Sequence, residues 1–211
     1  MAGSSGWPRL TSIVPSTQHH EDRSNGYDAV ASQLIRRRDR STIGVATVRN
    51  WAKVLPAGAS ILDIGCGHGV PISAALLEDG YVVYAVDASP SLTSEFRRRF
   101  PGAQVVCEAA EDSSFFEKTF DGIIAIGLIF LLGAETQRKL IRRIAPALKK
   151  GGRFLFTAPT QRARWRDMLT SRESVSLGAE EYERLLSEAG LRVEGEYTDE
   201  GENHYYACVK P

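Results

Sequence analysis

The sequence predicts an α/β fold: a doubly wound, mostly parallel seven-stranded sheet with helices on both faces and its last strand reversed. Three observations predict it. Apolar runs of strand length alternate along the chain with segments whose apolar residues recur at helical spacing. Residues 61–64 form a strand-type run that leads directly into a turn with three glycines. The chain ends on two strand-type segments, 191–197 and 205–209, joined by a short connection that is typical of a hairpin.

The predicted elements alternate between helix and strand along a single domain, residues 25–211, which follows an expected flexible leader at residues 1–24. The apolar spacing predicts an amphipathic helix from Tyr27 and a second helix over 43–55. Segment 158–178 breaks the alternation and is expected to be an extra loop at the carboxyl edge of the sheet. The other predicted helices are 70–77, 90–100, 135–148 and 180–189, and the other predicted strands are 82–87, 103–107, 120–126 and 153–157.

The composition limits the classes of function. Lys and Arg total 26 residues and Asp and Glu also total 26, so the formal net charge is zero. A general nucleic-acid or membrane-surface binder would carry an excess of positive charge. Cys66, Cys107 and Cys208 show no paired spacing, which indicates a reduced, cytoplasmic protein without a Cys/His metal site. No apolar stretch reaches the length that a membrane span needs.

The first strand and the turn after it read Ile-Leu-Asp-Ile-Gly-Cys-Gly-His-Gly. Gly65, Gly67 and Gly69 remove the Cβ atoms that would keep backbone N–H groups away from a ligand. Asp63 is a carboxylate in a buried-type strand, where it is costly without a cleft or a partner, so we expect it to point toward a bound molecule. The dinucleotide fingerprint would need a glycine at Val70, and no Gly-Lys-Ser or Gly-Lys-Thr follows as in a phosphate loop.

A second acid marks the end of the next strand. Asp87 ends the run Val82–Asp87 and follows Gly65 by 22 residues. An acid about 20 residues after the glycine turn, at the tip of the second strand, is placed to hydrogen-bond ribose hydroxyls. Together these features predict a site for an adenosine-type ligand without a required pyrophosphate.

The glycine turn, Asp87 and the run Leu-Lys-Lys-Gly-Gly-Arg-Phe at 148–154 resemble the class I S-adenosylmethionine-dependent methyltransferases, which are three-layer α/β/α sandwiches. The resemblance extends from about Tyr27 to the C-terminus, and it implies that the helix from Tyr27 is an N-terminal cap helix over the cofactor pocket. It implies S-adenosylmethionine as cofactor and S-adenosylhomocysteine as product, with the turn packed on the methionine part and Asp87 on the ribose. It also implies an adenine contact among residues 110–112, with the choice left open. The cofactor-binding residues expected are Tyr27, Asp63, Gly65, Cys66, Gly67, Gly69, Val70, Pro71, Asp87, Ala88, Ala110, Glu111, Asp112, Gly127 and Leu128.

No motif identifies the methyl acceptor, but four residues are candidate contacts. Phe130 follows the fourth strand and is expected either to line the acceptor pocket or to belong to the core. Arg164 and Trp165 lie in segment 158–178 and suit a carboxylate or a flat acceptor, with an ordinary surface loop as the alternative. His204, expected in the turn of the terminal hairpin, is the fourth candidate. A small-molecule acceptor is favoured over DNA or RNA because the chain has neither excess positive charge nor a nucleic-acid module.

Methyl transfer from a sulfonium mainly requires two positioned reactants, because the leaving group is already activated. A general base helps where the acceptor is an oxygen or nitrogen acid. The candidates are His204, Tyr27, Tyr205 and the leader histidines His19 and His20. A plain surface position is the alternative for His204.

Two other functions stay open at this point. A nicotinamide-dependent oxidoreductase shares the strand, the glycine turn and the acid, although Val70 and the terminal hairpin count against it. A non-catalytic S-adenosylmethionine-binding module would need no general base. Turnover with any acceptor would exclude such a module.

Overall fold

The computed structural model describes residues 22–211. The expected leader, residues 1–24, lies almost wholly outside this range, as do the candidate bases His19 and His20. The domain boundary at residue 25 therefore stays a prediction.

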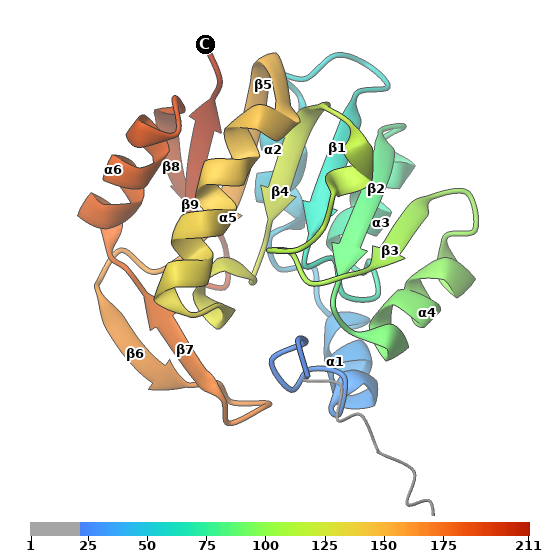
Figure 1. Ribbon diagram of the computed structural model, residues 1–211. Coiled ribbons are helices and arrows are strands. Elements are labelled where there is room, and N and C mark those ends of the chain that lie inside the picture. The colour runs from blue at the N-terminus through green and yellow to red at the C-terminus, as the bar shows by residue number, and fades with distance from the viewer. Residues whose placement is uncertain (1–21) are drawn as a thin grey trace, which may run out of the picture.

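A seven-stranded sheet forms the centre of the protein (Figure 1). Its strands lie in the order β3-β2-β1-β4-β5-β9-β8, and neighbours are parallel except where β9 pairs with β5 and β8. This arrangement confirms the predicted doubly wound sheet with its last strand reversed. The strands are β1 (Ser60–Ile64), β2 (Val82–Asp87), β3 (Gln104–Cys107), β4 (Phe120–Ala125), β5 (Leu148–Thr157), β8 (Arg192–Thr198) and β9 (His204–Val209).

Helices cover both faces of the sheet. They are α1 (Ala31–Arg38), α2 (Val45–Ala52), α3 (Ile72–Glu78), α4 (Pro90–Arg99), α5 (Ala134–Ala147) and α6 (Ala179–Glu188), with short 3₁₀ turns η1 (Phe115–Glu117) and η2 (Ile129–Leu131). Trp51, Leu76 and Phe96 from α2, α3 and α4 share one apolar cluster, and Ile141 and Leu185 from α5 and α6 share another. In Figure 1, α5 and α6 lie in front of the sheet and α2 and α3 behind it. No helix of the described part is both long and apolar enough to cross a membrane.

Strand β1 shows why both faces of the sheet are apolar. Ile61 packs with α2 and α3, whereas Leu62 and Ile64 pack with α5 and α6, and all three side chains are fully buried. Successive side chains of a strand point to opposite faces, and a parallel sheet covered on both sides buries both sets. This burial fixes the carboxyl end of β1, and with it the turn that starts at Gly65.

Segment 158–178 contains a hairpin rather than the plain loop that was expected. Its strands β6 (Ala163–Arg166) and β7 (Glu173–Ser176) pair with each other in a separate antiparallel sheet. Three of the four residues of β7 are buried, but β6 is mostly exposed. The sequence of β6 therefore carries no apolar run that would have marked it as a strand.

The helix predicted from Tyr27 begins four residues later, at Ala31. Residues 23–30 form turns instead. Asn25 and Gly26 have φ angles of 53° and 85°, which a right-handed helix does not allow, and the Asp22 carboxylate accepts the Gly26 N–H at 3.0 Å. Residues 22–30, here called the N-terminal segment, thus form successive turns rather than the first part of a helix.

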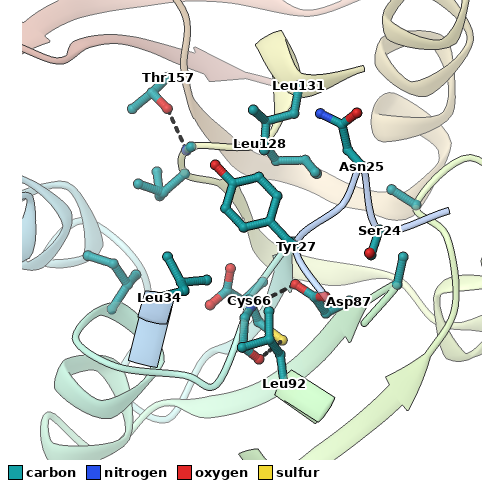
Figure 2. Close-up of a pocket in the computed structure, with 18 of the residues that line it drawn as sticks. Ser24, Asn25, Tyr27, Leu34, Cys66, Asp87, Leu92, Leu128, Leu131 and Thr157 are labelled. Carbon is teal, nitrogen blue, oxygen red and sulfur yellow. Dashed lines mark hydrogen bonds between the residues drawn. The ribbon is translucent and has the colours of Figure 1, made fainter. Parts of the chain in front are cut away.

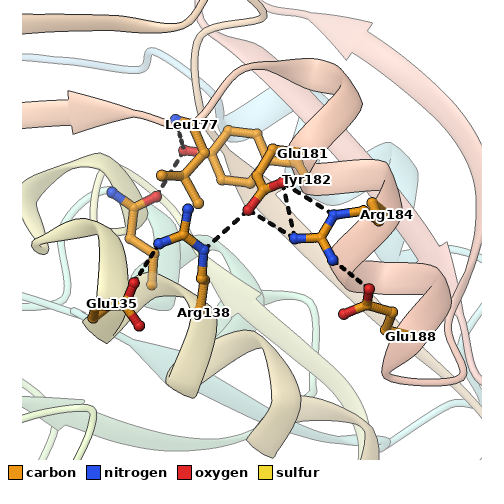
Figure 3. A network of polar contacts seen from close by, with 8 residues as sticks. Glu135, Arg138, Leu177, Glu181, Tyr182, Arg184 and Glu188 are labelled. Atoms are coloured by element: carbon orange, nitrogen blue, oxygen red, sulfur yellow. Dashed lines mark hydrogen bonds and ion pairs between the residues drawn. The ribbon is translucent and has the colours of Figure 1, made fainter.

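Surface ion pairs connect α5 to α6 (Figure 3). Arg138 lies 2.6 Å from Glu135 on its own helix and 3.0 Å from Glu181 on α6. Glu181 also pairs with Arg184 at 2.9 Å. Exposed pairs of this kind contribute at most about 1 kcal/mol each to stability. They therefore add little to the free energy that packs the two helices together.

A buried hydrogen-bond cluster also joins α5 and α6. The Tyr182 hydroxyl donates to Gln137 Oε1 at 2.8 Å, and Gln137 Nε2 donates to the carbonyls of Leu132 and Val175, both at 2.8 Å. Gln137 and Tyr182 are fully buried. One glutamine therefore ties the chain after β4 and the strand β7 to α5, and Leu132 of the chain after β4 lines the pocket described next.

Candidate functional site

A pocket of about 340 Å³ opens at the carboxyl ends of β1, β2 and β4 (Figure 2). Ligands bind at this edge in open α/β sheets. One side of the pocket is the glycine turn and the tip of β2, and the other sides come from the N-terminal segment, η2 and residues 199–205. Figure 2 shows Tyr27 between these sides, with Leu128 on one flank of its ring and Cys66 and Asp87 on the other.

The three glycines of the turn share a positive φ angle but differ in what an added Cβ would meet. All have positive φ angles, between 57° and 87°. A Cβ on Gly65 would lie 2.9 Å from the Leu128 side chain, and one on Gly69 would lie 2.6 Å from the Phe100 ring. A Cβ on Gly67 would meet no protein atom within 4 Å. Gly65 and Gly69 therefore allow close packing, whereas Gly67 leaves pocket space free.

Asp87 fastens the turn to the end of β2. Its Oδ2 accepts the Gly67 N–H at 2.8 Å and its Oδ1 accepts the Ser89 N–H at 2.9 Å. Burial raises the pKa of Asp87, and these two donors act in the opposite direction. Each carboxylate oxygen has a second lone pair, so Asp87 can still accept hydrogen bonds from a molecule in the pocket.

Asp63 also lines the pocket, although only 3% of it is exposed. The Ser73 hydroxyl donates to its Oδ2 at 2.6 Å. Burial raises the pKa of Asp63 to about 7, with a smaller contribution from the charge of Asp87. The expectation that Asp63 faces a cleft agrees with this position.

The predicted adenine contacts lie at different depths. Ala110 and Glu111 line the pocket, whereas Asp112 does not. Arg23 of the N-terminal segment lies 2.6 Å from Glu111 and 2.9 Å from Asp112. The N-terminal segment is therefore anchored to the loop after β3, and the Asp112 side chain, 63% exposed, belongs to that anchor.

The chain after β4 supplies an apolar wall. Gly127, Leu128 and Phe130 line the pocket. The Gly127 N–H donates to the Thr157 hydroxyl at 2.7 Å, a bond visible at the top of Figure 2. Gly127 has a φ of 74°, so the wall turns sharply after β4 and Leu128 is directed over the glycine turn.

The two candidate tyrosine bases donate hydrogen bonds to carboxylates. The Tyr27 hydroxyl donates to Asp167 Oδ2 at 3.0 Å, and the Tyr205 hydroxyl donates to Asp199 Oδ2 at 2.7 Å. Burial, followed by the neighbouring carboxylate, raises the pKa of both phenols well above the usual range. Both line the pocket, but as proton donors rather than as groups ready to accept a proton.

Several predicted residues lie outside the pocket lining. His204 begins β9 rather than lying in the hairpin turn, its ring packs edge-on against Tyr206 with centroids 4.7 Å apart, and its Nε2 lies 3.0 Å from Glu196 Oε2. Arg164 is exposed and pairs with Glu173 at 2.7 Å. Trp165 contacts Phe130, with ring centroids 5.6 Å apart, and so supports the pocket from behind. Among the expected cofactor residues, Gly69, Pro71 and Asp112 do not line the pocket, while the others do.

The structure adds pocket residues that the sequence did not reveal, among them Arg38, Thr157, Asp167, Asp199 and Asn203. They come from four separate stretches of chain, so no local motif unites them. Arg38 alone had a usable signal, since it follows Leu34 by four residues and thus shares the helix face that points inward. Among residues 22–211, no three His, Cys, Asp or Glu side chains gather as a metal site would need.

The chain is similar to known methyltransferases in sequence and in fold. Residues 61–152 match the family model described as a methyltransferase domain. A cypemycin N-terminal methyltransferase from Streptomyces sp is 41% identical over 98 residues, 45% of this chain and 40% of that protein. The aklanonic acid methyltransferase DauC from Streptomyces sp. (strain C5) is 27% identical over 155 residues, 70% of this chain and 66% of that protein.

Solved structures share the fold. The S-adenosylmethionine-bound amino pentose methyltransferase CalS10 from Micromonospora echinaspora superposes with a TM-score of 0.67 at 17% identity, over 86% of this chain and 97% of that chain. The chain spans 40% and 66% of the lengths of the two curated relatives. None of these matches supports a nicotinamide-dependent oxidoreductase. Residues 61–152 are therefore similar to the methyltransferase domain family, within a chain that has the class I methyltransferase fold.

Proposed function

We propose that this protein is an S-adenosylmethionine-dependent methyltransferase that acts on a small-molecule acceptor and releases S-adenosylhomocysteine. The observation that carries the proposal is the pairing of the Asp87 carboxylate with the open face of Gly67 at one end of the pocket. The carboxylate can accept from ribose hydroxyls, and the missing Cβ leaves room for a ligand to approach the backbone.

The residues around this pair fit the cofactor. Leu92, Ala110 and Leu128 present apolar surface for the two faces of an adenine, beside the hydroxyl-binding Asp87. Figure 2 places Leu92 and Leu128 on opposite sides of the pocket. The cavity of about 340 Å³ lies within the size range of small-molecule sites. When bound, the cofactor supplies a methyl group on a sulfonium, which is already an activated leaving group.

The contribution of the protein is then mainly to position the two reactants and to exclude water. The N-terminal segment covers the pocket, and Leu128, Phe130 and Leu131 make its wall apolar. The raised pKa values of Tyr27 and Tyr205 argue against either phenol as a general base at neutral pH. Positioning accounts for the reaction best where the acceptor is already nucleophilic.

A small-molecule acceptor is supported from two sides. Two of the similar proteins are named for aklanonic acid and for an amino pentose. The balance of 26 basic and 26 acidic residues gives the chain no general attraction for a polyanion. The cytoplasmic location expected from the unpaired cysteines stays a prediction.

The first test is calorimetric titration with S-adenosylmethionine, S-adenosylhomocysteine and NAD. The wild-type chain should bind both sulfur nucleosides and not NAD. Asp87→Ala removes charge-assisted hydrogen bonds and should weaken that binding by about 100-fold. Glu183→Ala, which removes an exposed carboxylate on α6 that makes no ion pair in the described structure, is the matched control and should change nothing.

The outcomes separate the rival functions. Binding of NAD without the sulfur nucleosides would overturn the proposal. Binding of S-adenosylmethionine without turnover on a broad panel of amines, phenols and carboxylic acids would favour a non-catalytic binding module. Equal affinities for wild type and Asp87→Ala would show that the ligand does not use the tip of β2.

A further inference from the structure

The β6–β7 hairpin carries arginines on one face and an acid on the other. The Asp167 N–H donates to the Arg172 carbonyl at 2.8 Å, so the extended pairing of β6 reaches Asp167. Successive side chains of a strand point to opposite faces. Arg164 and Arg166 are accordingly exposed, whereas Trp165 and Asp167 are partly buried. Of these four residues Asp167 alone lines the pocket, so the hairpin presents a carboxylate there rather than a guanidinium.

The Asp167 carboxylate has hydrogen-bonding capacity left for a ligand. Its Oδ1 accepts the N–H groups of Leu169 and Thr170 at 2.9 Å and 2.8 Å and the Thr170 hydroxyl at 3.1 Å. Within the described chain its Oδ2 accepts the Tyr27 hydroxyl alone, at 3.0 Å, which leaves that oxygen a lone pair. Among residues 22–211 no Lys, Arg or His nitrogen lies within 4.0 Å of this carboxylate. A partly buried anion without a cation suits a ligand that brings positive charge.

Asp167 stays ionised at neutral pH. Burial raises its pKa, but the N–H groups of Thr170 and Leu169 and the Tyr27 hydroxyl outweigh burial, so that the pKa lies below the ordinary value. These donors stabilise the charged form of the carboxyl group. A lasting negative charge therefore faces this side of the pocket, and Asp167 is not suited to accept a proton.

Aromatic rings lie close to this carboxylate. Tyr27 and Phe130 both line the pocket, and the Trp165 ring packs against Phe130 with centroids 5.6 Å apart. Figure 2 shows the Tyr27 ring within the pocket. The faces of aromatic rings attract cations. A carboxylate beside such rings is complementary to an ammonium group, whereas it gains less from a hydroxyl group and repels a carboxylate.

We propose that Asp167, Tyr27 and Phe130 form the acceptor subsite and that this subsite selects an amine. The inference rests on the proposed function, because the amine receives the methyl group. An amine that is protonated in solution first gives one proton to water. Its nitrogen lone pair then forms the bond to the methyl carbon as the C–S bond breaks and its electron pair stays on sulfur. The positive charge passes from sulfur to nitrogen, where the Asp167 carboxylate stabilises it. Asp167 is thus a specificity-determining residue.

Three probes with one skeleton and different charges test the subsite. They are benzylamine, benzyl alcohol and phenylacetate, each titrated calorimetrically into protein that is saturated with S-adenosylhomocysteine. Asp167→Asn removes the charge and keeps the shape of the side chain. Glu173→Gln is the matched control, because it removes the same charge from the same hairpin at an exposed position outside the pocket. Tyr27→Phe is a second control, which removes the hydrogen bond to Asp167 and keeps the acid and the ring.

The wild type should bind benzylamine about tenfold more tightly than benzyl alcohol, and phenylacetate most weakly. Asp167→Asn should bind benzylamine and benzyl alcohol equally well. Glu173→Gln and Tyr27→Phe should keep the preference for the amine. This preference is a ratio of two affinities of one variant, so a general loosening of the pocket does not remove it. Should Asp167→Asn fail to fold in a thermal melt, Asp167→Ser keeps a side-chain oxygen for the turn and gives the same readout.

Four results would overturn the inference. The first is equal affinity of the wild type for the amine and the alcohol, and the second is a preference that survives in Asp167→Asn. The third is no binding of benzylamine at millimolar concentrations. The fourth is turnover of phenols or carboxylic acids, but not of amines, on the acceptor panel. Failure of the proposed function looks different, because then S-adenosylhomocysteine itself does not bind the wild type.

Discussion

The inner and outer walls of the pocket are held by different kinds of contact. The inner wall, the turn Gly65–Gly69 with Asp87, is held by backbone groups: the Gly65 N–H donates to the Val86 carbonyl at 2.7 Å, and the Gly67 N–H donates to Asp87. The outer wall consists of the N-terminal segment, the β6–β7 hairpin and residues 199–205. Side chains hold it, among them Tyr27 on Asp167 at 3.0 Å.

The two walls therefore differ in how many of their residues can be substituted without loss of the wall. Backbone bonds at the end of a buried strand survive most substitutions, provided that the glycines and the acid remain. The ion pairs of the outer wall, such as Asp22 with Arg172 at 3.1 Å, are exposed and contribute at most about 1 kcal/mol each. A ligand common to many enzymes belongs on the inner wall, and an acceptor that differs between enzymes belongs on the outer wall.

The largest expected effect concerns Gly69, which belongs to the turn without lining the pocket. Gly69→Ala forces a Cβ to 2.6 Å from Phe100 and 2.8 Å from Phe96, at a φ of 87°. Backbone strain and overpacking together should lower the free energy of unfolding by about 3 kcal/mol. In a chain of this size the midpoint of thermal unfolding should fall by roughly 6–12 °C, which calorimetry measures.

Gly67→Ala is the matched comparison within the same turn. Its Cβ meets no protein atom within 4 Å and its φ is 57°, so the cost to stability should be only about 1 kcal/mol. The added methyl group enters pocket space and should weaken S-adenosylhomocysteine binding instead. Equal effects of the two substitutions on stability and on binding would show that the glycines are not divided between packing and ligand access.

The next effect is a pH dependence at Asp63. Burial raises the pKa of Asp63 to about 7 from 3.8, so its contribution to stability is complete below about pH 4 and is lost as the pH rises toward 7. S-adenosylhomocysteine carries an ammonium group, which would favour the ionised form of the Asp63 carboxyl group if the two lie close together. The affinity for S-adenosylhomocysteine should therefore increase by about tenfold between pH 6 and pH 8.

Asp63→Asn keeps the bond with the Ser73 hydroxyl and removes the titration. This variant should bind S-adenosylhomocysteine more weakly than the wild type at pH 8, and its affinity should not change between pH 6 and pH 8. Its free energy of unfolding should not show the decline between pH 4 and pH 7 that is expected for the wild type. Besides burial, the groups that act on the Asp63 pKa are Ser73, Asp87 and Arg38. A tenfold rise that persists in Asp63→Asn would assign the titration to Asp87 instead.

The inner wall could be predicted from the sequence because its chemistry is local. Gly65, Gly67 and Asp87 are set by a strand, a turn and the next strand, and each has one conformational or chemical reason to be there. The sheet was predictable on the same ground, since apolar runs such as β2 specify buried strands, and the predicted bounds of β2, 82–87, match the structure.

Tyr27 and Tyr205 of the outer wall were candidates from the sequence, but their partners could not be predicted because these residues meet only after folding. Asp167 lies in the β6–β7 connection and accepts a hydrogen bond from Tyr27, 140 positions away in the chain. No motif near either residue predicts this contact. His204 shows the opposite case. Its residue type suggested a base, but its side chain packs on Tyr206, away from the pocket.

The smallest effect that we predict tests whether the outer wall closes on the ligand. Tyr27→Phe removes the hydrogen bond to Asp167 while it keeps the ring that Figure 2 shows in the pocket. Loss of one such bond costs about 1 kcal/mol, so S-adenosylhomocysteine should bind about fivefold more weakly. Amide hydrogen exchange in residues 22–30 should become faster. Tyr197→Phe, at an exposed tyrosine of β8, is the control and should change neither quantity.

The two readouts together decide what this bond does. Faster amide hydrogen exchange in residues 22–30 without weaker S-adenosylhomocysteine binding would mean that Asp167 anchors the N-terminal segment but that this segment does not bind the cofactor. The segment would then affect only the access of the acceptor to the pocket. Weaker binding by more than the tenfold range expected for Asp63 would make the outer wall as important for the cofactor as the inner wall. The division between a backbone-held site for the common ligand and a side-chain-held cover would then be wrong, because a single phenol on the cover would contribute as much as the buried acid beneath it.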